Sequence, residues 1–270
     1  MKNSFFILLL SCLVVQNVST QNIVEDAIPI EIGNIITIES EVLEEERELY
    51  ISLPSNYDST EEDLPVVYVL DAEYRFNIAQ SIQTYFGLSP QIPSAILVGI
   101  ANPSRDIRNR DLLPDSYGGE ADQFVEFIKT EVFPFIEENF NASNERFLIG
   151  HSHGGVFAVH TLLNHSELFD GYAAIDPSLK FIYGDDETSL TKNFSSKTLY
   201  LASSDVAYGY LEDVKADIQN DFNIFRLQLD EHSSINNLSY KIDHIADDHG
   251  NSYIQGFSRA YRFLFNWRFE

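Results

Sequence analysis

The chain has 270 residues, 44% of them hydrophobic and 13% aromatic, which is enough for one α/β domain with a large core. Its formal net charge of −25 argues against a nucleic-acid partner, because binding phosphates requires a surplus of lysine and arginine. We find no internal repeat, no low-complexity tract and no linker rich in glycine, serine or proline. The sequence therefore predicts a single domain after the N-terminal segment.

Residues 1–20 have the pattern of a secretory signal peptide. Lys2 supplies the positive charge, residues 5–15 form a short apolar run, and small and polar residues lead to a cleavage site near Thr20. The run is too short for a membrane span, and no other stretch is long and apolar enough. We expect an exported domain, periplasmic or secreted, over residues 21–270. Lipoprotein acylation at Cys12, the only cysteine, is a weaker alternative because the apolar run continues past it.

The strand predictions fall into two groups. Residues 34–40 and 47–53 alternate in part between apolar and polar side chains, which is typical of half-buried antiparallel strands. Continuous apolar runs, typical of strands covered on both faces, follow at 65–70, 95–101, 147–150, 172–175 and 198–202, and a last strand is expected at 238–244.

Helical patterns lie between these strands. They cover residues 123–140, 155–163 and 253–265, with a weaker pattern at 211–222. Alternation of strands and helices predicts an α/β fold whose central sheet is mostly parallel and has helices on both faces. The two amphipathic strands would form an antiparallel edge at the N-terminal side.

The segment from Gly150 to Gly154 predicts a nucleophile elbow. Ser152 lies between two glycines, after a strand and before a helix, so a sharp turn would lift its hydroxyl above the edge of the sheet. Such a serine needs a base, and in α/β hydrolases the base is a histidine in a loop after the last strand. His249 has that position, and His244 is its only serious rival.

The acid that orients the histidine is less clearly marked. In chain order it should follow the strand at 198–202, where Asp205 is the first carboxylate. Glu212 and Asp213 are the alternatives. The oxyanion would be bound by the backbone N–H of His153 and by that of Ala72 or Glu73.

Metal and cofactor motifs were not found. The sequence has no histidine pair at helical metal-binding spacing with a carboxylate between, no cysteine pair, no phosphate-binding loop and no dinucleotide fingerprint. We expect no metal and no cofactor.

Taken together, these segments resemble the esterase family of α/β hydrolases that includes esterase D, the enterobactin-type siderophore esterases and the mycolyltransferases. The matching segments are residues 47–54 with Tyr57, 65–71, 98–114, 150–155, 172–179 and 248–250. The resemblance implies an α/β-hydrolase fold and a serine esterase with Ser152 as nucleophile and His249 as base. This chain departs from the family in having Ala72 where the oxyanion turn commonly has glycine.

The function predicted is an exported serine hydrolase that cleaves a carboxylic ester through an acyl-enzyme. Small-molecule esters, siderophore lactones and acylated polysaccharides are the candidate substrates. Two alternatives stay open: an acyltransferase on the same scaffold, and a catalytically silent exported binding protein. Three arginines at positions 105, 108 and 110 either contact an anionic substrate or pair with the neighbouring aspartates 106, 111 and 115.

Overall fold

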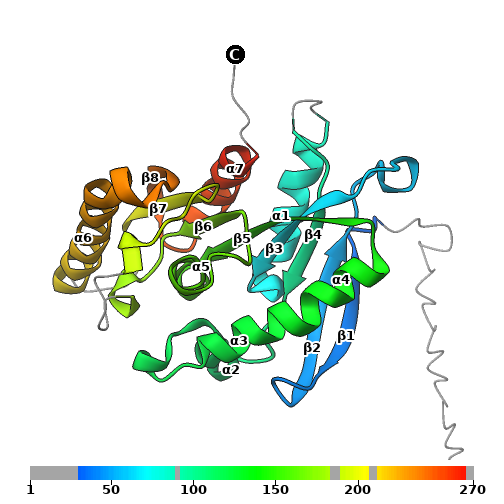
Figure 1. The fold of residues 1–270 in the computed structure, drawn as a ribbon, viewed down its shortest axis with the longest axis horizontal. Coiled ribbons are helices and arrows are strands. Elements are labelled where there is room, and N and C mark those ends of the chain that lie inside the picture. The colour runs from blue at the N-terminus through cyan, green and yellow to red at the C-terminus, as the bar shows by residue number, and fades with distance from the viewer. Residues whose placement is uncertain (1–29, 89–91, 183–188, 207–211, 266–270) are drawn as a thin grey trace, which may run out of the picture. The chain divides into compact units, whose positions relative to one another are not determined.

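The computed structural model describes residues 30–88, 92–182, 189–206 and 212–265, with the side chains of residues 206 and 212–215 left aside. The predicted signal segment lies outside these ranges. Contacts divide the chain into two units, Met1–Glu31 and Ile32–Glu270, and the fold described here is that of the second (Figure 1).

Eight strands form one sheet in the order β1-β2-β4-β3-β5-β6-β7-β8. β1 pairs with β2 and β2 with β4 in antiparallel fashion, and all other neighbours are parallel. The mostly parallel sheet with an antiparallel N-terminal edge is thus confirmed. The bounds are Asn34–Ser40, Glu45–Ser52, Leu64–Leu70, Ile96–Ile100, Ala142–His151, Gly171–Ile175, Thr198–Val206 and Ser239–Asp248 for β1 to β8.

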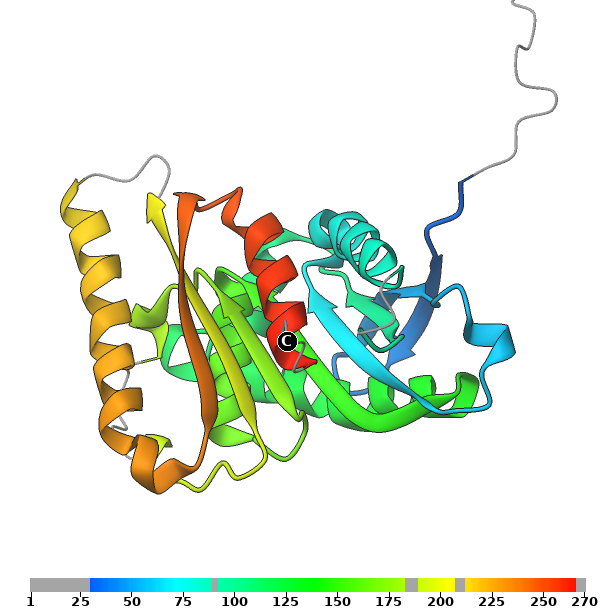
Figure 2. The same cartoon turned by 90° about the horizontal axis from the view of Figure 1, so that it is seen from above.

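Helices cover both faces of the sheet (Figure 2). α1 (Ala72–Phe86) and α7 (Ser252–Leu264) bury their apolar side chains in one core. The second core contains side chains of α3 (Ala121–Phe127), α4 (Phe133–Asn139), α5 (His153–Asn164) and α6 (Glu212–Asn236). Because the central strands are buried on both faces, they have the continuous apolar sequences that parallel strands require.

Two helices have no counterpart among the sequence predictions. α1 fully buries only Ala72, Phe76 and Ala79, but Ile82 and Phe86 pack against the same core, so its apolar residues recur every three or four positions. α2 (Arg105–Leu112) is short and highly charged, and it is held by ion pairs more than by an apolar face. Arg47 of β2 is fully buried and bonds to Asp111 of α2. These polar contacts are invisible to a search for hydrophobic periodicity.

The predicted helix at 123–140 is one continuous stretch of three pieces. α3 and α4 are joined by a π-helical turn at Ile128–Val132. No described helix is long and apolar enough to cross a membrane. The turns that follow β3, β4, β5, β6 and β8 leave the sheet at the same edge, where parallel strands have their carboxyl ends, and the candidate site lies there.

Candidate active site

Ser152 occupies a strained turn between β5 and α5. Its backbone angles are φ 58° and ψ −120°, a conformation that is costly for any residue other than glycine. Two backbone hydrogen bonds fix it: Ser152 N–H donates to Ile175 O at 3.0 Å, and Val156 N–H donates to Ser152 O at 3.0 Å. The elbow predicted from the sequence is therefore present in the fold.

The glycine at position 150 is required by this turn. A Cβ atom there would lie 2.0 Å from the carbonyl oxygen of Gly154, well inside van der Waals contact. A Cβ at Gly155 would lie 3.1 Å from the Cβ of Pro177, so that position is also tight. β5 and α5 can pass each other at the elbow because Gly150 lacks a side chain, and α5 can lie close to Pro177 because Gly155 lacks one.

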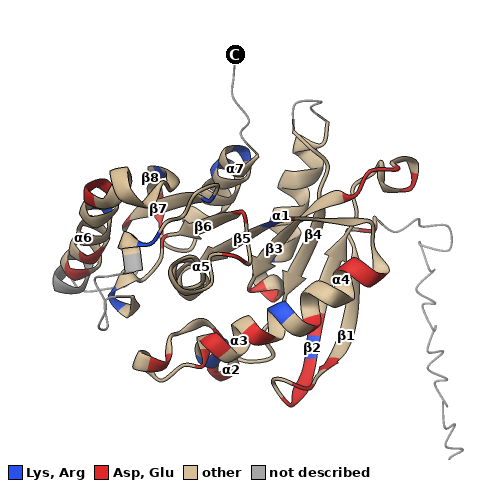
Figure 3. Ribbon diagram, viewed as in Figure 1, with Lys and Arg blue, Asp and Glu red and all other residues tan. Residues whose placement is uncertain are grey.

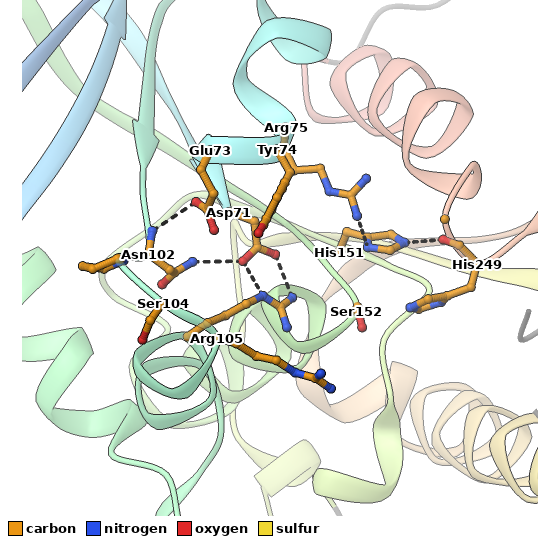
Figure 4. A pocket seen from close by; sticks show the side chains of 13 residues that line it. Asp71, Glu73, Tyr74, Arg75, Asn102, Ser104, Arg105, His151, Ser152 and His249 are labelled. Atoms are coloured by element: carbon orange, nitrogen blue, oxygen red, sulfur yellow. Dashed lines mark hydrogen bonds and ion pairs between the residues drawn. The ribbon is translucent and has the colours of Figure 1, made fainter. Parts of the chain in front are cut away.

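His249 and Asp176 form the central polar pair of the site. The Nδ1 atom of His249, in the loop between β8 and α7, lies 2.6 Å from the Oδ2 atom of Asp176, which directly follows β6. Because a carboxylate accepts, Nδ1 carries the proton and Nε2 is left with a free lone pair. The imidazole of His249 points toward Ser152 across the pocket (Figure 4).

The carboxylate of Asp176 is held on both oxygens. Oδ1 accepts from the backbone N–H of Ser204 at 2.9 Å, and Oδ2 accepts from the Ser204 hydroxyl at 2.5 Å. Burial by itself raises the pKa of Asp176, but the hydrogen bonds from His249 and Ser204 lower it further than burial raises it. Asp176 therefore stays ionised at neutral pH and fixes the orientation of the imidazole.

The prediction that Asp205 orients His249 does not match this geometry. The Oδ1 atom of Asp205 lies 2.5 Å from Nε2 of His244, the rival histidine, and both side chains are exposed. β7 runs past its predicted end at Ala202 to Val206, so Asp205 lies within a strand paired with β8 and not in a loop beneath His249. The side chains of Glu212 and Asp213 lie outside the described part of the structure.

His151 anchors the loop that carries His249. Its side chain is buried, and Nε2 lies 2.6 Å from the carbonyl oxygen of His249 while Nδ1 lies 3.1 Å from Nη2 of Arg75. Since a guanidinium only donates, Nδ1 must accept and Nε2 must donate to His249. Burial, Arg75 and His249 all lower the pKa of His151, so it remains neutral. The residue before the elbow serine thus positions the histidine loop.

The two N–H groups predicted to bind an oxyanion lie at helix N-termini. Ala72 begins α1 and His153 begins α5, where the first N–H groups have no partner within the helix. Among the described residues, no hydrogen bond to either N–H is seen. The two turns lie against each other, because a Cβ at Gly154 would be 3.4 Å from the Cβ of Leu70. The Ser152 hydroxyl also has no hydrogen-bond partner within the described residues, as is common before substrate binds.

A pocket of about 540 Å³ joins these groups. Its walls come from four turns at the carboxyl edge of the sheet and include Asp71, Glu73, Asn102, Arg105, Ser152 and His249. The volume is within the range of small-molecule sites. The sides of the pocket are polar and charged, which suits a ligand with hydrogen-bonding groups.

The three arginines of this region have different partners. Arg108 makes a bidentate ion pair with Asp71 at 2.6 and 2.8 Å, which joins α2 to the turn before α1. Arg110 pairs with Asp111 and Glu45. Arg105 lines the pocket, and within the described residues its side chain has no ion pair or hydrogen bond. Of the two alternatives that the sequence offered, pairing with a neighbouring aspartate applies to Arg110 only. Arg108 pairs with Asp71, which is distant in sequence, and Arg105 faces the pocket.

His151, Asp176 and His249 bring three potential metal-ligating atoms within 4.8 Å of one another. Asp176 and His249 hydrogen-bond to each other, and the guanidinium of Arg75 contacts His151, where its positive charge opposes a cation. Asp176 itself was missed by the sequence predictions, although a signal existed. The apolar run at 172–175 ends directly in Asp-Pro, and a carboxylate at the carboxyl end of the strand beside the elbow strand is well placed for a site.

Comparison with known proteins gives a consistent picture. A family model described as "Putative esterase" matches residues 40–202. The chain is 33% identical to the siderophore triacetylfusarinine C esterase of Aspergillus fumigatus, over 43% of this chain and 44% of that protein. It is 31% identical to the ferri-bacillibactin esterase BesA of Bacillus subtilis, over 48% of this chain and 53% of that protein. The chain thus matches about half the length of these curated relatives.

Among solved structures, an IroE-like serine hydrolase from Shewanella oneidensis superposes with a TM-score of 0.78 at 28% identity, covering 87% of this chain and 80% of that chain. The superposition covers most of the described fold and agrees with the α/β-hydrolase architecture predicted from the sequence.

Proposed function

This chain belongs to the "Putative esterase" family, and from that premise we propose that it is an exported serine hydrolase that cleaves a carboxylic ester through an acyl-enzyme. The observation that carries the proposal is the contact of 2.6 Å between His249 Nδ1 and Asp176 Oδ2, in the pocket that also holds the strained Ser152. A nucleophile, a base and an orienting carboxylate converge there.

Ser152 attacks the ester carbonyl while Nε2 of His249 accepts the hydroxyl proton. Asp176 stabilises the imidazolium that forms, and the N–H groups of His153 and Ala72 donate to the oxyanion. The imidazolium then protonates the departing alkoxide. In the second half, His249 removes a proton from a water molecule as that water attacks the acyl-serine, and the imidazolium then returns the proton to the Ser152 oxygen as the acid product leaves.

The substrate class we propose is the ester backbone of a siderophore. One curated relative is named as a siderophore esterase and another as a ferri-bacillibactin esterase. A polar pocket of about 540 Å³ fits one arm of such a ligand, and Arg105 on its wall can contact an anionic group. The proposed substrate class rests on the hydrolase proposal, but it can be wrong while the hydrolase proposal stands.

Ser152→Ala is the direct test of the nucleophile. We expect turnover of p-nitrophenyl butyrate to fall by about 10³–10⁶-fold while the circular dichroism spectrum is unchanged, because only the hydroxyl is removed. A stoichiometric burst of p-nitrophenol in the wild type, absent from the variant, would establish the acyl-enzyme. Activity retained by Ser152→Ala would refute the mechanism.

The substrate class is tested by incubating the protein with triacetylfusarinine C and with ferri-bacillibactin and separating the products by mass. We expect ring-opened esters from at least one of them, and none with Ser152→Ala. If p-nitrophenyl esters are cleaved and neither siderophore is, the hydrolase stands and the substrate class is wrong. If an added alcohol captures most of the acyl group in place of water, the enzyme is an acyltransferase.

Export is proposed from the pattern of residues 1–20, with Thr20 as the approximate cleavage site. N-terminal sequencing of the protein recovered outside the cytoplasm should begin near residue 21. A mature chain that begins with a lipid-modified Cys12 would favour membrane anchoring instead.

A further inference from the structure

A second cluster of titratable side chains lies outside the active-site pocket. Nε2 of His160 and Nε2 of His165 both contact one carboxylate oxygen, Oδ1 of Asp122, at 2.8 and 2.9 Å. The three ligating atoms lie within 4.8 Å of one another. Two imidazoles and a carboxylate that converge on one point are a common ligand set for a transition-metal ion.

The three side chains come from two helices and from the residue that caps one of them. Asp122 is in the first turn of α3, His160 is in α5, and His165 directly follows the last residue of α5. The backbone of His165 is fixed, since its N–H donates to Thr161 O at 2.7 Å and its carbonyl accepts from Leu168 N–H at 3.1 Å. The ligand positions are therefore set by the fold before any ion binds.

The spacing is close to what an ion requires. With ligand bonds of 2.0–2.2 Å in tetrahedral geometry, the ligating atoms lie about 3.3–3.5 Å apart. The present contacts of 2.8 and 2.9 Å need to widen by only about half an ångström, which rotation of side chains can supply. Imidazole nitrogen also disfavours Mg²⁺ and Ca²⁺, which prefer oxygen ligands.

Exposure and surroundings also suit an ion. The His160 side chain is 11% exposed and that of Asp122 is 59% exposed, so the site has a buried floor and an open side through which an ion and its remaining water ligands can enter. The side-chain amide nitrogen of Asn164 donates to Nδ1 of His160 at 3.2 Å; when Nε2 binds a metal, Nδ1 carries the proton, and the amide must turn so that its oxygen accepts from it.

We propose that Asp122, His160 and His165 bind one divalent transition-metal ion of the zinc type, with solvent in the open position, and that this ion fastens α3 to the carboxyl end of α5. The ion is structural: none of the three residues lines the pocket of Ser152. The inference is independent of the proposed function.

The experiment uses metal-free full-length protein without a histidine tag. Calorimetric titration with ZnCl₂ should show one ion per chain, and saturating zinc should raise the melting temperature, because an ion that binds only the folded state adds stability. His165→Gln and Asp122→Asn should each weaken this site at least about tenfold and leave ester turnover unchanged. Both side chains are partly exposed, so the variants should fold, and circular dichroism checks this.

Two matched controls locate the ion. His249→Gln removes a ligand from the active-site cluster, and His244→Gln removes the exposed pair with Asp205; zinc binding should survive both. Zinc binding that disappears in His249→Gln but persists in His165→Gln would place the ion in the active site and overturn the proposal. So would the absence of one-to-one binding, or a rise in melting temperature that MgCl₂ reproduces in the wild type and in His165→Gln.

Discussion

At the scale of single residues, the carboxylate of Asp176 bonds both to Ser204 and to the imidazole of His249. Its φ of 46° lies in the left-handed region, and its N–H donates to Ala202 O at 2.7 Å, so its backbone is fixed at the end of β6. From there it accepts hydrogen bonds from Ser204 and from His249. The strained backbone is what aims the carboxylate under the histidine loop.

Substituting each candidate acid in turn, Asp176 and then Asp205, tests which of them orients His249. Asp176→Asn should reduce kcat with p-nitrophenyl butyrate by about 10²–10⁴-fold, because an amide cannot stabilise the imidazolium and favours the wrong tautomer. Asp205→Asn should change kcat by less than roughly twofold, since Asp205 contacts His244. Equal losses in both variants, with folding intact, would return Asp205 to consideration.

The histidines beside Ser152 predict a loss of stability in acid. Burial and the charge of Arg108 lower the pKa of His153 from 6.5 to about 4, and the pKa of His151 is lowered as well. A histidine with a depressed pKa binds fewer protons when folded than when unfolded. Its contribution to stability is fully present above pH 6.5 and is lost as the pH falls toward 4.

Urea unfolding at pH 7 and pH 5 measures this effect. The free energy of unfolding of the wild type should be lower at pH 5, and the difference should shrink in His153→Gln, which cannot take up the proton. An identical pH dependence in wild type and variant would contradict the assignment of His153.

At the scale of elements, the elbow is a backbone contact between β5 and α5, which touch at Gly150 and Gly154. β5 delivers Ser152, α5 leads away from it, and the carbonyl of Gly154 fills the space that a side chain at position 150 would need. The same helix carries His160 toward α3 and Asp122. α5 therefore links Ser152 to the second cluster in one rigid element.

Gly150→Ala tests the closeness of this contact. With a Cβ placed 2.0 Å from Gly154 O, the backbone must move, and we expect a loss of about 3 kcal/mol or more together with the loss of activity. Gly87→Ala is the matched control at the end of α1, where a Cβ would meet its nearest atom at 3.4 Å, and it should change stability by less than about 0.5 kcal/mol. Thermal unfolding of the two variants compares them directly, and similar losses would contradict the argument.

At the scale of the whole molecule, charge is unbalanced. The sequence has 42 acidic and 17 basic residues, and acidic side chains are prominent along α3, α4 and α6 (Figure 3). Like charges at the surface repel one another and oppose the compact state. The basic residues are used in part for fixed contacts such as the buried pair of Arg47 and Asp111, which salt screens little.

Salt should therefore stabilise the protein. Raising NaCl from about 20 mM to about 200 mM at constant pH shortens the screening length severalfold, and we expect the melting temperature to rise by about 2–4 °C. KCl should act equally, since screening depends on ionic strength and not on the ion. A falling melting temperature would mean that attractive surface pairs outweigh the repulsion.

The sequence by itself determined which strands are buried on both faces and which two form the antiparallel edge. It also located the turn at Ser152 and the loop that carries His249. These follow from local causes: apolar runs mark strands buried on both faces, and Gly150 precedes Ser152 because the turn leaves no room there for a side chain. His249 could be identified because the loop after the last strand has a fixed place in such a sheet. The helix α2 was missed because ion pairs hold it, and ion pairs leave no apolar periodicity; α1 does have apolar residues at helical spacing, which the sequence predictions did not use.

Only the tertiary structure decided which acid faces His249 and which side chains share the second cluster. Asp176 and Asp205 both follow apolar runs in the sequence, and the choice between them depends on β7 extending past Ala202 beside β8, which places Asp205 within the strand. His160 and His165 meet Asp122 because α3 packs beside α5, although the chain separates them widely. Local patterns fix what each segment becomes; distances between segments depend on register and packing, which no single segment contains.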